Sequence, residues 1–176
     1  MKLLLLNGNT DAAITDRLVA AARAMGPHEV VGMTARFGAR YIATRAAAAI
    51  AAHAVLDALA EALAEPAHGY DAAIIACFGD PGLEAAREMF SIPVLGLADA
   101  SIAAALEVAP TVSLLTGGAA WVPMLREFCL LRGHGPERVR VAAVAPTGDM
   151  IAAQPERALA LLAEAAWAEA DRKSVV

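Results

Sequence analysis

Short apolar runs alternate with helical stretches along this chain, and that alternation constrains the fold more than any other feature of the sequence. It is typical of an α/β protein with a parallel sheet, because each parallel strand needs a crossover connection to the next. The expected strands cover residues 2–6, 29–34, 72–76, 94–97, 112–116 and 138–144. The expected helices cover about 11–25, 44–64, 81–90, 99–108, 120–132 and 155–170.

The two halves of the chain repeat one plan, in which a strand leads through a polar or glycine-containing turn into a helix. Such turns follow the expected strands at Asn7–Thr10, Cys77–Asp80 and Thr116–Gly118. The carboxyl ends of parallel strands meet at one edge of a sheet, where α/β proteins bind ligands. No linker or low-complexity stretch separates independent domains, so the length suits one domain or two small lobes that share a core.

Composition narrows the class of protein. Hydrophobic residues make up 59% of the 176 residues but aromatic ones only 5%, so the apolar content is largely alanine and favours helix packing. No apolar run approaches the roughly 20 residues that cross a bilayer, and the start of the chain lacks a signal-peptide pattern. Two cysteines without a spaced framework indicate a reducing compartment. A net charge of −5 argues against a nucleic-acid partner. We therefore expect a cytoplasmic protein, without a membrane partner, that binds a small molecule.

Cys77 is the leading candidate for chemistry, because it follows a buried strand and precedes a helix start. Asp80 can serve as the N-cap of that helix, Pro81 as its first residue, and Glu84 places an acid in the first turn. A thiol near a helix N-terminus is expected to ionise more easily than at the usual pKa of about 8.5, although the Asp80 carboxylate opposes this. The alternative is a small buried hydrophobic residue, as free cysteines often are.

The other two turns offer oxygen-binding groups. Asn7–Thr10 supplies short polar side chains at a helix start, and Thr116–Gly118 supplies glycines that let a backbone approach a ligand closely. Taken alone, each turn is equally well explained as a cap or a connection. Neither matches a dinucleotide or phosphate fingerprint, since no G-x-G-x-x-G or G-x-x-x-x-G-K-[ST] occurs.

Several other residues are expected to be structural. The histidines His28, His53, His68 and His134 are dispersed without metal-ligand spacing, so no metal site is expected. Cys129 falls on an apolar helical stripe, and we expect it in the core, with Trp121 and Trp167 as packing residues. A Ser-His-Asp hydrolase is not supported, because no G-x-S-x-G elbow is present.

Four segments together resemble the aspartate/glutamate racemase superfamily, and within it the hydantoin racemase group. They are residues 7–10 (NGNT), 41–57 (from YIATR to HAVLD), 69–101 around the Cys77 turn, and 115–121 (LTGGAAW). The resemblance extends to about residue 163, and the Cys77 segment is its most specific part. The first loop of hydantoin racemases commonly has proline where this chain has Gly8.

The resemblance implies a cofactor-independent isomerase with two flavodoxin-like or Rossmann-like lobes, the pseudo-symmetric racemase fold. On that reading residues 1–97 form the first lobe, which carries Cys77, and residues 98–176 form the second. Cys77 would be one acid/base, taking or giving a proton at an acidic carbon of a hydantoin- or amino-acid-like substrate. The substrate oxygens would be held by two groups of residues, Asn9, Thr10, Phe78 and Gly79 in the first lobe and Thr116, Gly117 and Gly118 in the second. Proton transfer on both faces of a planar carbanion is what inverting a stereocentre requires.

The second acid/base of the family lies on a strand after the helix that here ends near residue 170. We expect the second lobe to lack its last strand and helix, and Cys129 belongs to an earlier helix. The apolar surface left by that loss would favour a homo-oligomer.

Three alternatives stay open. One is a single-cysteine decarboxylase or one-base isomerase of the same fold. Another is an inactive or truncated ligand-binding member. A third is a flavodoxin-like binding protein that uses the same sheet edge for a flavin or nucleotide.

Overall fold

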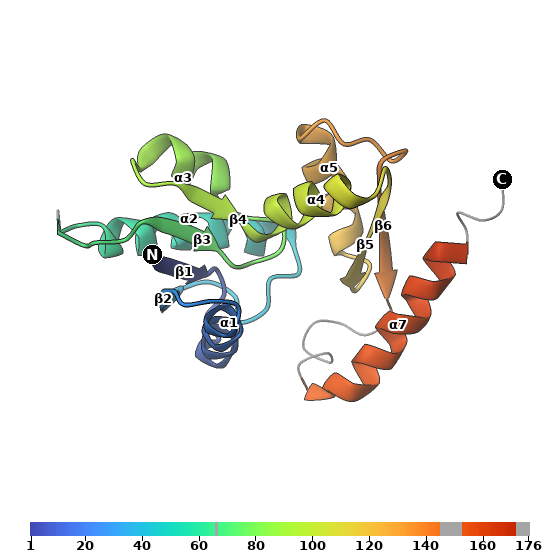
Figure 1. The fold of residues 1–176 in the computed structure, drawn as a ribbon, viewed down its shortest axis with the longest axis horizontal. Coiled ribbons are helices and arrows are strands. Elements are labelled where there is room, and N and C mark those ends of the chain that lie inside the picture. Colours follow the sequence, from blue (N-terminus) through green and yellow to red (C-terminus); the bar gives the residue numbers. More distant parts are fainter. Residues whose placement is uncertain (66, 145–152, 172–176) are drawn as a thin grey trace. The chain divides into compact units, whose positions relative to one another are not determined.

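The computed structural model describes residues 1–65, 67–144 and 153–171, and the chain divides into two compact units. Unit 1 is Met1–Ile102 and unit 2 is Ala103–Val176 (Figure 1). Each unit contains parallel strands joined through helices, so the predicted α/β class with parallel sheets is confirmed. Among the residues described, no helix is both long and apolar enough to span a membrane.

Unit 1 is built on a four-stranded parallel sheet in the order β2-β1-β3-β4. The strands are β1 (Lys2–Asn7), β2 (Glu29–Thr34), β3 (Ala72–Ile75) and β4 (Val94–Gly96). The connecting helices are α1 (Ala12–Ala24), α2 (Arg45–Ala62) and α3 (Leu83–Met89), and α4 (Leu97–Val108) follows β4 directly and runs into unit 2. These bounds agree with the expected elements to within a few residues.

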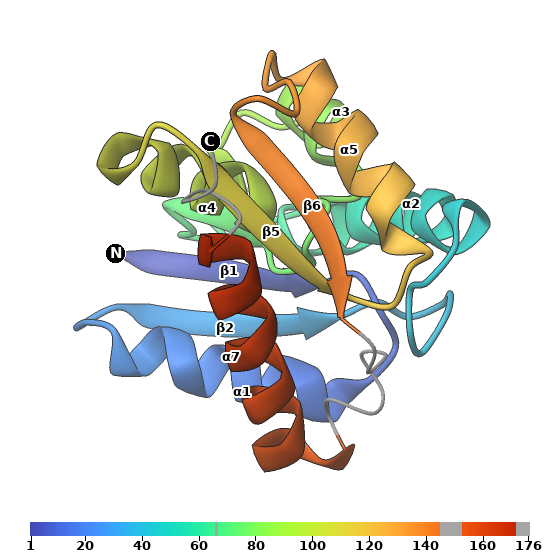
Figure 2. The same cartoon turned by 90° about the vertical axis from the view of Figure 1, so that its right-hand side faces the viewer.

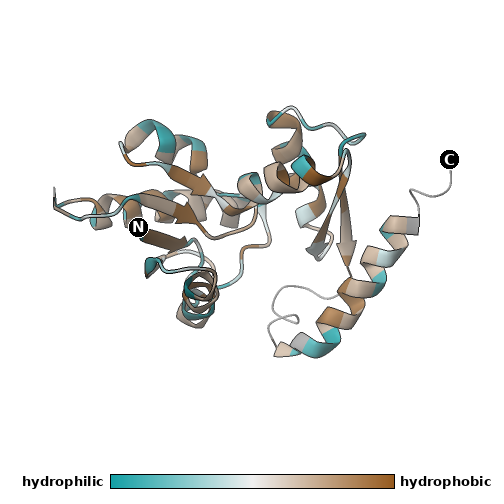
Figure 3. Cartoon of the chain, in the orientation of Figure 1, coloured by the Kyte–Doolittle hydropathy of each residue, from teal (hydrophilic) through white to brown (hydrophobic). Residues whose placement is uncertain are grey.

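Both faces of the unit 1 sheet are covered, because the run of leucines in β1 is apolar on each side. Leu4 and Leu6 pack with Val55 and Leu59 of α2. Leu5 points to the opposite face, where its cluster includes Val19 of α1. Figure 2 shows α1 lying along β1 and β2, and Figure 3 shows the hydrophobic colour of β1 and β4. A parallel sheet covered on both faces is the usual arrangement in α/β proteins.

Unit 2 pairs β5 (Val112–Gly117) with β6 (Val139–Val144) in parallel. The helix α5 (Trp121–Leu131) lies between them in sequence and contacts β6, and α7 (Pro155–Asp171) contacts β5. Cys129 of α5 is 1% exposed, so its predicted place in the core is confirmed. Trp167 is 73% exposed, so its predicted packing role is wrong.

Candidate active site

Cys77 lies just beyond the carboxyl end of β3, at the edge of the unit 1 sheet. The strand ends as Ala76 donates its N–H to the carbonyl of Leu6 at 2.8 Å. A turn follows, closed by the Asp80 N–H, which donates to the Cys77 carbonyl at 2.9 Å. Gly79 within that turn has a φ of 102°, a conformation that favours glycine. The thiol is therefore held on a tight turn at the ligand-binding edge of the sheet.

Asp80 does not cap the helix that follows it, which corrects the sequence-based assignment. The helix α3 begins at Leu83, after Gly82 with a φ of 82°, so Pro81 is not its first residue. The Asp80 carboxylate instead accepts the N–H of Ala98 at 2.9 Å and the N–H of Asp99 at 2.8 Å. In the first turn of a helix, N–H groups have no carbonyl partner within the helix itself. By accepting two of these N–H groups in α4, Asp80 caps a helix start 18 residues further along the chain.

The expectation of an easily ionised thiol is also wrong. Burial raises the pKa of Cys77 from its ordinary value of 9.0 to about 12, and the negative charge of Asp80 acts in the same direction. The sulfur packs against the hydrophobic core of unit 1, where a thiolate loses its hydration. The α3 N-terminus does not offset that loss, because α3 begins only at Leu83, six residues after Cys77. Cys77 is thus a thiol at neutral pH.

The Asn7–Thr10 loop lies beside the Cys77 turn, since β1 and β3 are neighbours with Leu6 opposite Ile75. Asn7 is 2% exposed, and its NH2 group donates to the Asn9 side-chain oxygen at 2.9 Å and to the Thr15 hydroxyl at 3.0 Å. Its own oxygen accepts the Asn9 N–H at 3.1 Å. Asn7 therefore shapes the loop, which brings Asn9 to the sheet edge that carries Cys77.

Several donors at this edge have no partner within the described part of the chain. They are the N–H groups of Phe78 and Gly79 and the side-chain NH2 of Asn9, for which no hydrogen bond is formed there. The Thr10 N–H, by contrast, donates to the Ala39 carbonyl at 3.2 Å, which leaves its hydroxyl as the group that could meet a ligand. Unpaired donors on the loops that flank one thiol are suited to hold an oxygen that gains negative charge.

The remaining predicted residues lie in unit 2. Thr116 and Gly117 are the last residues of β5, and Gly118 follows with a φ of 88°. The Gly118 N–H donates to the Val144 carbonyl at 3.1 Å, so this donor is already used. Unit 1 thus brings together Asn9, Thr10, Cys77, Phe78 and Gly79, while the glycine turn belongs to the other unit.

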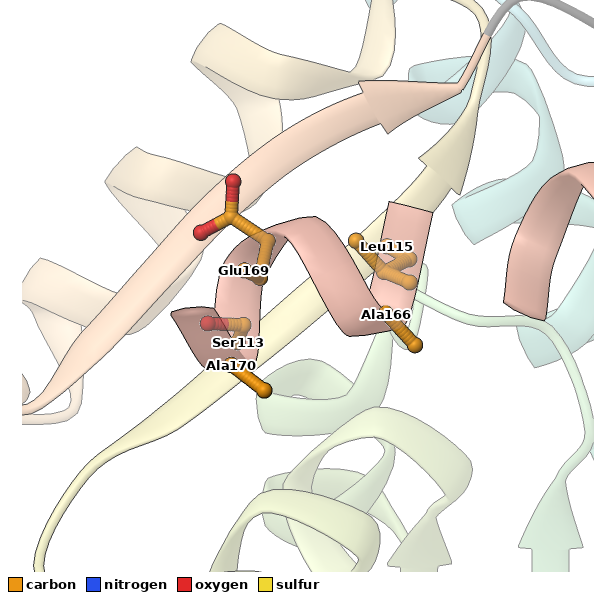
Figure 4. A pocket seen from close by; sticks show the side chains of 5 residues that line it. All are labelled: Ser113, Leu115, Ala166, Glu169 and Ala170. Carbon is orange, nitrogen blue, oxygen red and sulfur yellow. The ribbon is translucent and has the colours of Figure 1, made fainter. Parts of the chain in front are cut away.

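Unit 2 also contains a pocket of about 180 Å³ between β5 and α7 (Figure 4). None of the predicted site residues lines it; its walls are Ser113, Leu115, Ala166, Glu169 and Ala170. The Ser113 hydroxyl is buried there without a hydrogen-bond partner among the described residues. Within the same part of the chain, no group of three or more histidine, cysteine, aspartate or glutamate side chains is placed to hold a metal ion.

Sequence reasoning assigned Asp80 to the wrong helix and did not single out Gly96. A Cβ at Gly96 would collide with the Asp80 carboxylate, so glycine leaves room for that carboxylate beside α4. No local spacing signals this pair, because the two residues meet only through the pairing of β3 with β4. The one sign of this contact in the sequence is the aspartate that ends the Cys77 turn.

Comparison with known proteins agrees with the resemblance inferred from the sequence. The family model described as Asp/Glu/hydantoin racemase matches residues 3–176. A hydantoin racemase of Rhizobium meliloti is 33% identical over 138 residues, which are 78% of this chain and 56% of that protein. The fold matches the crystal structure of an allantoin racemase from Pseudomonas fluorescens with a TM-score of 0.84 and 30% identity, covering 92% of this chain and 68% of that one.

A second allantoin racemase structure, from Klebsiella pneumoniae, matches with a TM-score of 0.89 and 28% identity, over 97% of this chain and 69% of that one. The chain thus spans about half the length of the hydantoin racemase and about two thirds of each allantoin racemase. These matches confirm both the racemase fold and the resemblance to hydantoin racemases. With the family model covering nearly every residue, the chain belongs to the Asp/Glu/hydantoin racemase family.

Proposed function

We propose that this protein is a racemase that moves a proton at the acidic carbon of a hydantoin-like substrate, with Cys77 as one acid/base. The observation that carries the proposal is the position of Cys77 on a turn at the sheet edge, beside the unpaired N–H groups of Phe78 and Gly79. Membership of the family supports the reaction class. The names of the relatives support hydantoins, including allantoin, as the substrate class.

The chemistry requires a donor for one face of a planar intermediate. In a hydantoin, the acidic C–H bond is next to a carbonyl, so removal of the proton leaves an enolate with negative charge on oxygen. Because Cys77 is a thiol at neutral pH, it enters as the proton donor: its S–H bond breaks, a C–H bond forms, and a thiolate remains. In the reverse direction that thiolate removes the same proton, and a second group acts on the opposite face.

The enolate oxygen needs hydrogen-bond donors that are already in place. The Phe78 and Gly79 N–H groups and the Asn9 NH2 group meet this need in unit 1. The Thr10 hydroxyl and the residues Thr116–Gly118 are proposed to bind further oxygens of the substrate. Each preorganised donor of this kind is worth roughly a hundredfold to a thousandfold in rate.

Exchange in D2O tests the proposal. A single enantiomer of 5-benzylhydantoin or of allantoin is incubated with the enzyme, and loss of the C5–H signal is followed by NMR together with optical rotation. We expect wild-type protein to accelerate both above the enzyme-free rate, and Cys77→Ser to lower the enzymatic exchange by roughly a hundredfold or more. Cys129→Ala is the matched control, since that sulfur is buried in α5. Equal exchange by Cys77→Ser and wild type would refute the proposed role of Cys77.

A second candidate is a one-base isomerase or decarboxylase in which Cys77 is the only thiol that acts. It is favoured by the burial of Cys129, the other cysteine of these 176 residues, inside α5. The same D2O experiment separates the two candidates. Deuterium uptake with retention of configuration indicates one base, whereas uptake that accompanies inversion indicates two.

The cellular setting and assembly are proposals as well. Both cysteines are free thiols, which supports a reducing cytoplasm. Exposed apolar side chains on unit 2, among them Leu131, Leu159 and Trp167, support a homo-oligomer. Light scattering after size-exclusion chromatography tests this, and a monomer at all concentrations would contradict it.

A further inference from the structure

We infer that Asp80 is a positioning residue for Cys77: its buried carboxylate ties the turn that carries the thiol to the first turn of α4. The inference rests on the proposed function for its catalytic meaning. The geometry that supports it is independent of the substrate. Asp80 hydrogen-bonds to Cys77 through its backbone N–H and to α4 through its side chain.

The bonds of Asp80 fix the turn from both sides. Its N–H donates to the Cys77 carbonyl at 2.9 Å, and its own carbonyl accepts the Leu83 N–H at 3.1 Å, at the start of α3. Its carboxylate accepts the N–H groups of Ala98 and Asp99 at 2.9 and 2.8 Å. Bonds from an ionised carboxylate to backbone N–H groups are among the stronger ones in proteins. One side chain therefore connects the thiol turn, α3 and α4.

The surroundings of Asp80 confine its side chain. The side chain is 4% exposed and its φ is 46°, which non-glycine residues seldom adopt. Gly96 lies against the carboxylate, so that a Cβ there would collide with it. Unfavourable backbone conformations of this kind persist where surrounding structure holds them, and they are concentrated at functional sites.

The charge of Asp80 has a second effect, since it adds to burial in raising the pKa of Cys77. Two further carboxylates near this helix start pair with one cation: Arg87 lies 3.0 Å from Asp99 and 3.9 Å from Glu84. Asp80 is thus expected both to hold the turn and to keep the proton on the sulfur. Asp99 is the matched control, because its side chain is on the same helix start but pairs with Arg87 instead.

Alkylation of Cys77 by iodoacetamide at pH 8 tests the inference without any substrate. Site-resolved mass spectrometry separates Cys77 from Cys129. We expect Asp80→Asn, which keeps the size and tolerates a positive φ, to alkylate Cys77 roughly tenfold faster than wild type. Asp99→Asn is expected to stay within about twofold of wild type. Equal rates in Asp80→Asn and wild type, or equal acceleration in both variants, would overturn the inference.

Hydrogen exchange in the wild-type protein gives a test that does not depend on a variant folding. The Ala98 and Asp99 N–H groups are expected to exchange at least about a hundredfold more slowly than in an unstructured peptide, because Asp80 binds them. First-turn N–H groups without a cap would exchange near the unstructured rate, and that result would also overturn the inference. If Asp80→Asn does not fold by circular dichroism, this measurement decides.

The activity assay then separates this inference from the proposed function. If wild type exchanges C5–H and Asp80→Asn alkylates faster, kcat is expected to fall in Asp80→Asn while KM changes little. If no hydantoin is exchanged but Asp80→Asn still alkylates faster, Asp80 positions the thiol and the proposed reaction is wrong. If exchange depends on Cys77 while Asp80→Asn has wild-type kcat and alkylation, the reaction stands and the role of Asp80 fails.

Discussion

The buried side-chain amide of Asn7 donates a hydrogen bond of 3.0 Å to the hydroxyl of Thr15, which joins the end of β1 to α1. The Thr15 hydroxyl in turn lies 2.6 Å from the Thr34 hydroxyl at the end of β2. The same Asn7 amide donates to the Asp11 carbonyl at 3.1 Å, next to the start of α1. Asn7 and Thr15 together therefore join two neighbouring strands and a helix at the edge where Asn9 and Cys77 lie.

Replacing Asn7 with alanine is expected to lower the free energy of unfolding by about 2–4 kcal/mol, because it removes a buried amide whose NH2 group bonds to Asn9, Asp11 and Thr15 and whose oxygen accepts the Asn9 N–H. Urea unfolding followed by circular dichroism measures the change. Ser101→Ala is the control, since its exposed hydroxyl bonds only to the Leu97 carbonyl within α4. A loss no larger than that of the control would show that the network contributes little.

Gly82→Ala is expected to be more harmful than Gly133→Ala, although both residues have positive φ values, of 82° and 74°. A Cβ at Gly82 would lie 2.9 Å from the Ala52 carbonyl oxygen, whereas a Cβ at Gly133 would meet nothing within 4 Å. Both variants lose about 1 kcal/mol because alanine disfavours a positive φ. The difference between their unfolding free energies therefore measures the close approach of α2 to Gly82. We expect Gly82→Ala to lose at least about 1 kcal/mol more in chemical denaturation. Equal losses of unfolding free energy in the two variants would mean that α2 accommodates the added methyl group without a measurable cost.

Alkaline pH is expected to destabilise the protein through Cys77. The folded-state pKa of about 12 lies above the ordinary 9.0, so burial of the neutral thiol stabilises the fold below pH 9. That contribution is lost as the pH rises from 9 towards 12, by at most about 1.4 kcal/mol per pH unit. Unfolding free energies of wild type and Cys77→Ala at pH 7.5, 9 and 10.5 measure it. The advantage of wild type should shrink between pH 9 and 10.5, and a difference that does not vary with pH would contradict the raised pKa.

Ser113→Val is expected to be more stable than Ser113→Thr by about 1–2 kcal/mol. The two side chains have the same shape, and the pocket between β5 and α7 gives each of them room. Threonine keeps a buried hydroxyl for which the described residues provide no partner, and valine does not. Thermal unfolding of the pair measures the difference. Equal melting temperatures would indicate that the hydroxyl is satisfied in solution.

The strands and helices could be predicted because each is encoded by the residues within it. The apolar run at 72–76 and the alanine-rich stretch at 44–64 correspond to β3 and α2 with small shifts at their ends. Thr44 caps α2 by accepting the Ala47 N–H at 3.1 Å, a bond that spans three residues. Interactions of that range are visible in a sequence.

The errors share a different origin, since they concern contacts made through tertiary structure. Asp80 precedes α3 in the chain, yet its carboxylate bonds to α4, because β4 lies beside β3 and α4 begins where β4 ends. The raised pKa of Cys77 could not be predicted for the same reason: proximity to a helix start is local, whereas burial depends on the whole of unit 1. Trp167 gave no local sign of which side of α7 would meet the strands.

The four leucines of β1 also bear on the register in which this strand pairs with β2 and β3. Since Leu4 and Leu6 face one layer of helices and Leu5 the other, a slip of one residue would exchange leucine for leucine on both sides. Hydrophobic packing alone would therefore differ little between the two registers. The hydrogen bonds of Asn7 do distinguish the registers, because its amide meets its partners in only one of them. The Asn7 side chain therefore selects the register of β1, and its bonds to Asn9 set the loop that follows the strand in that register.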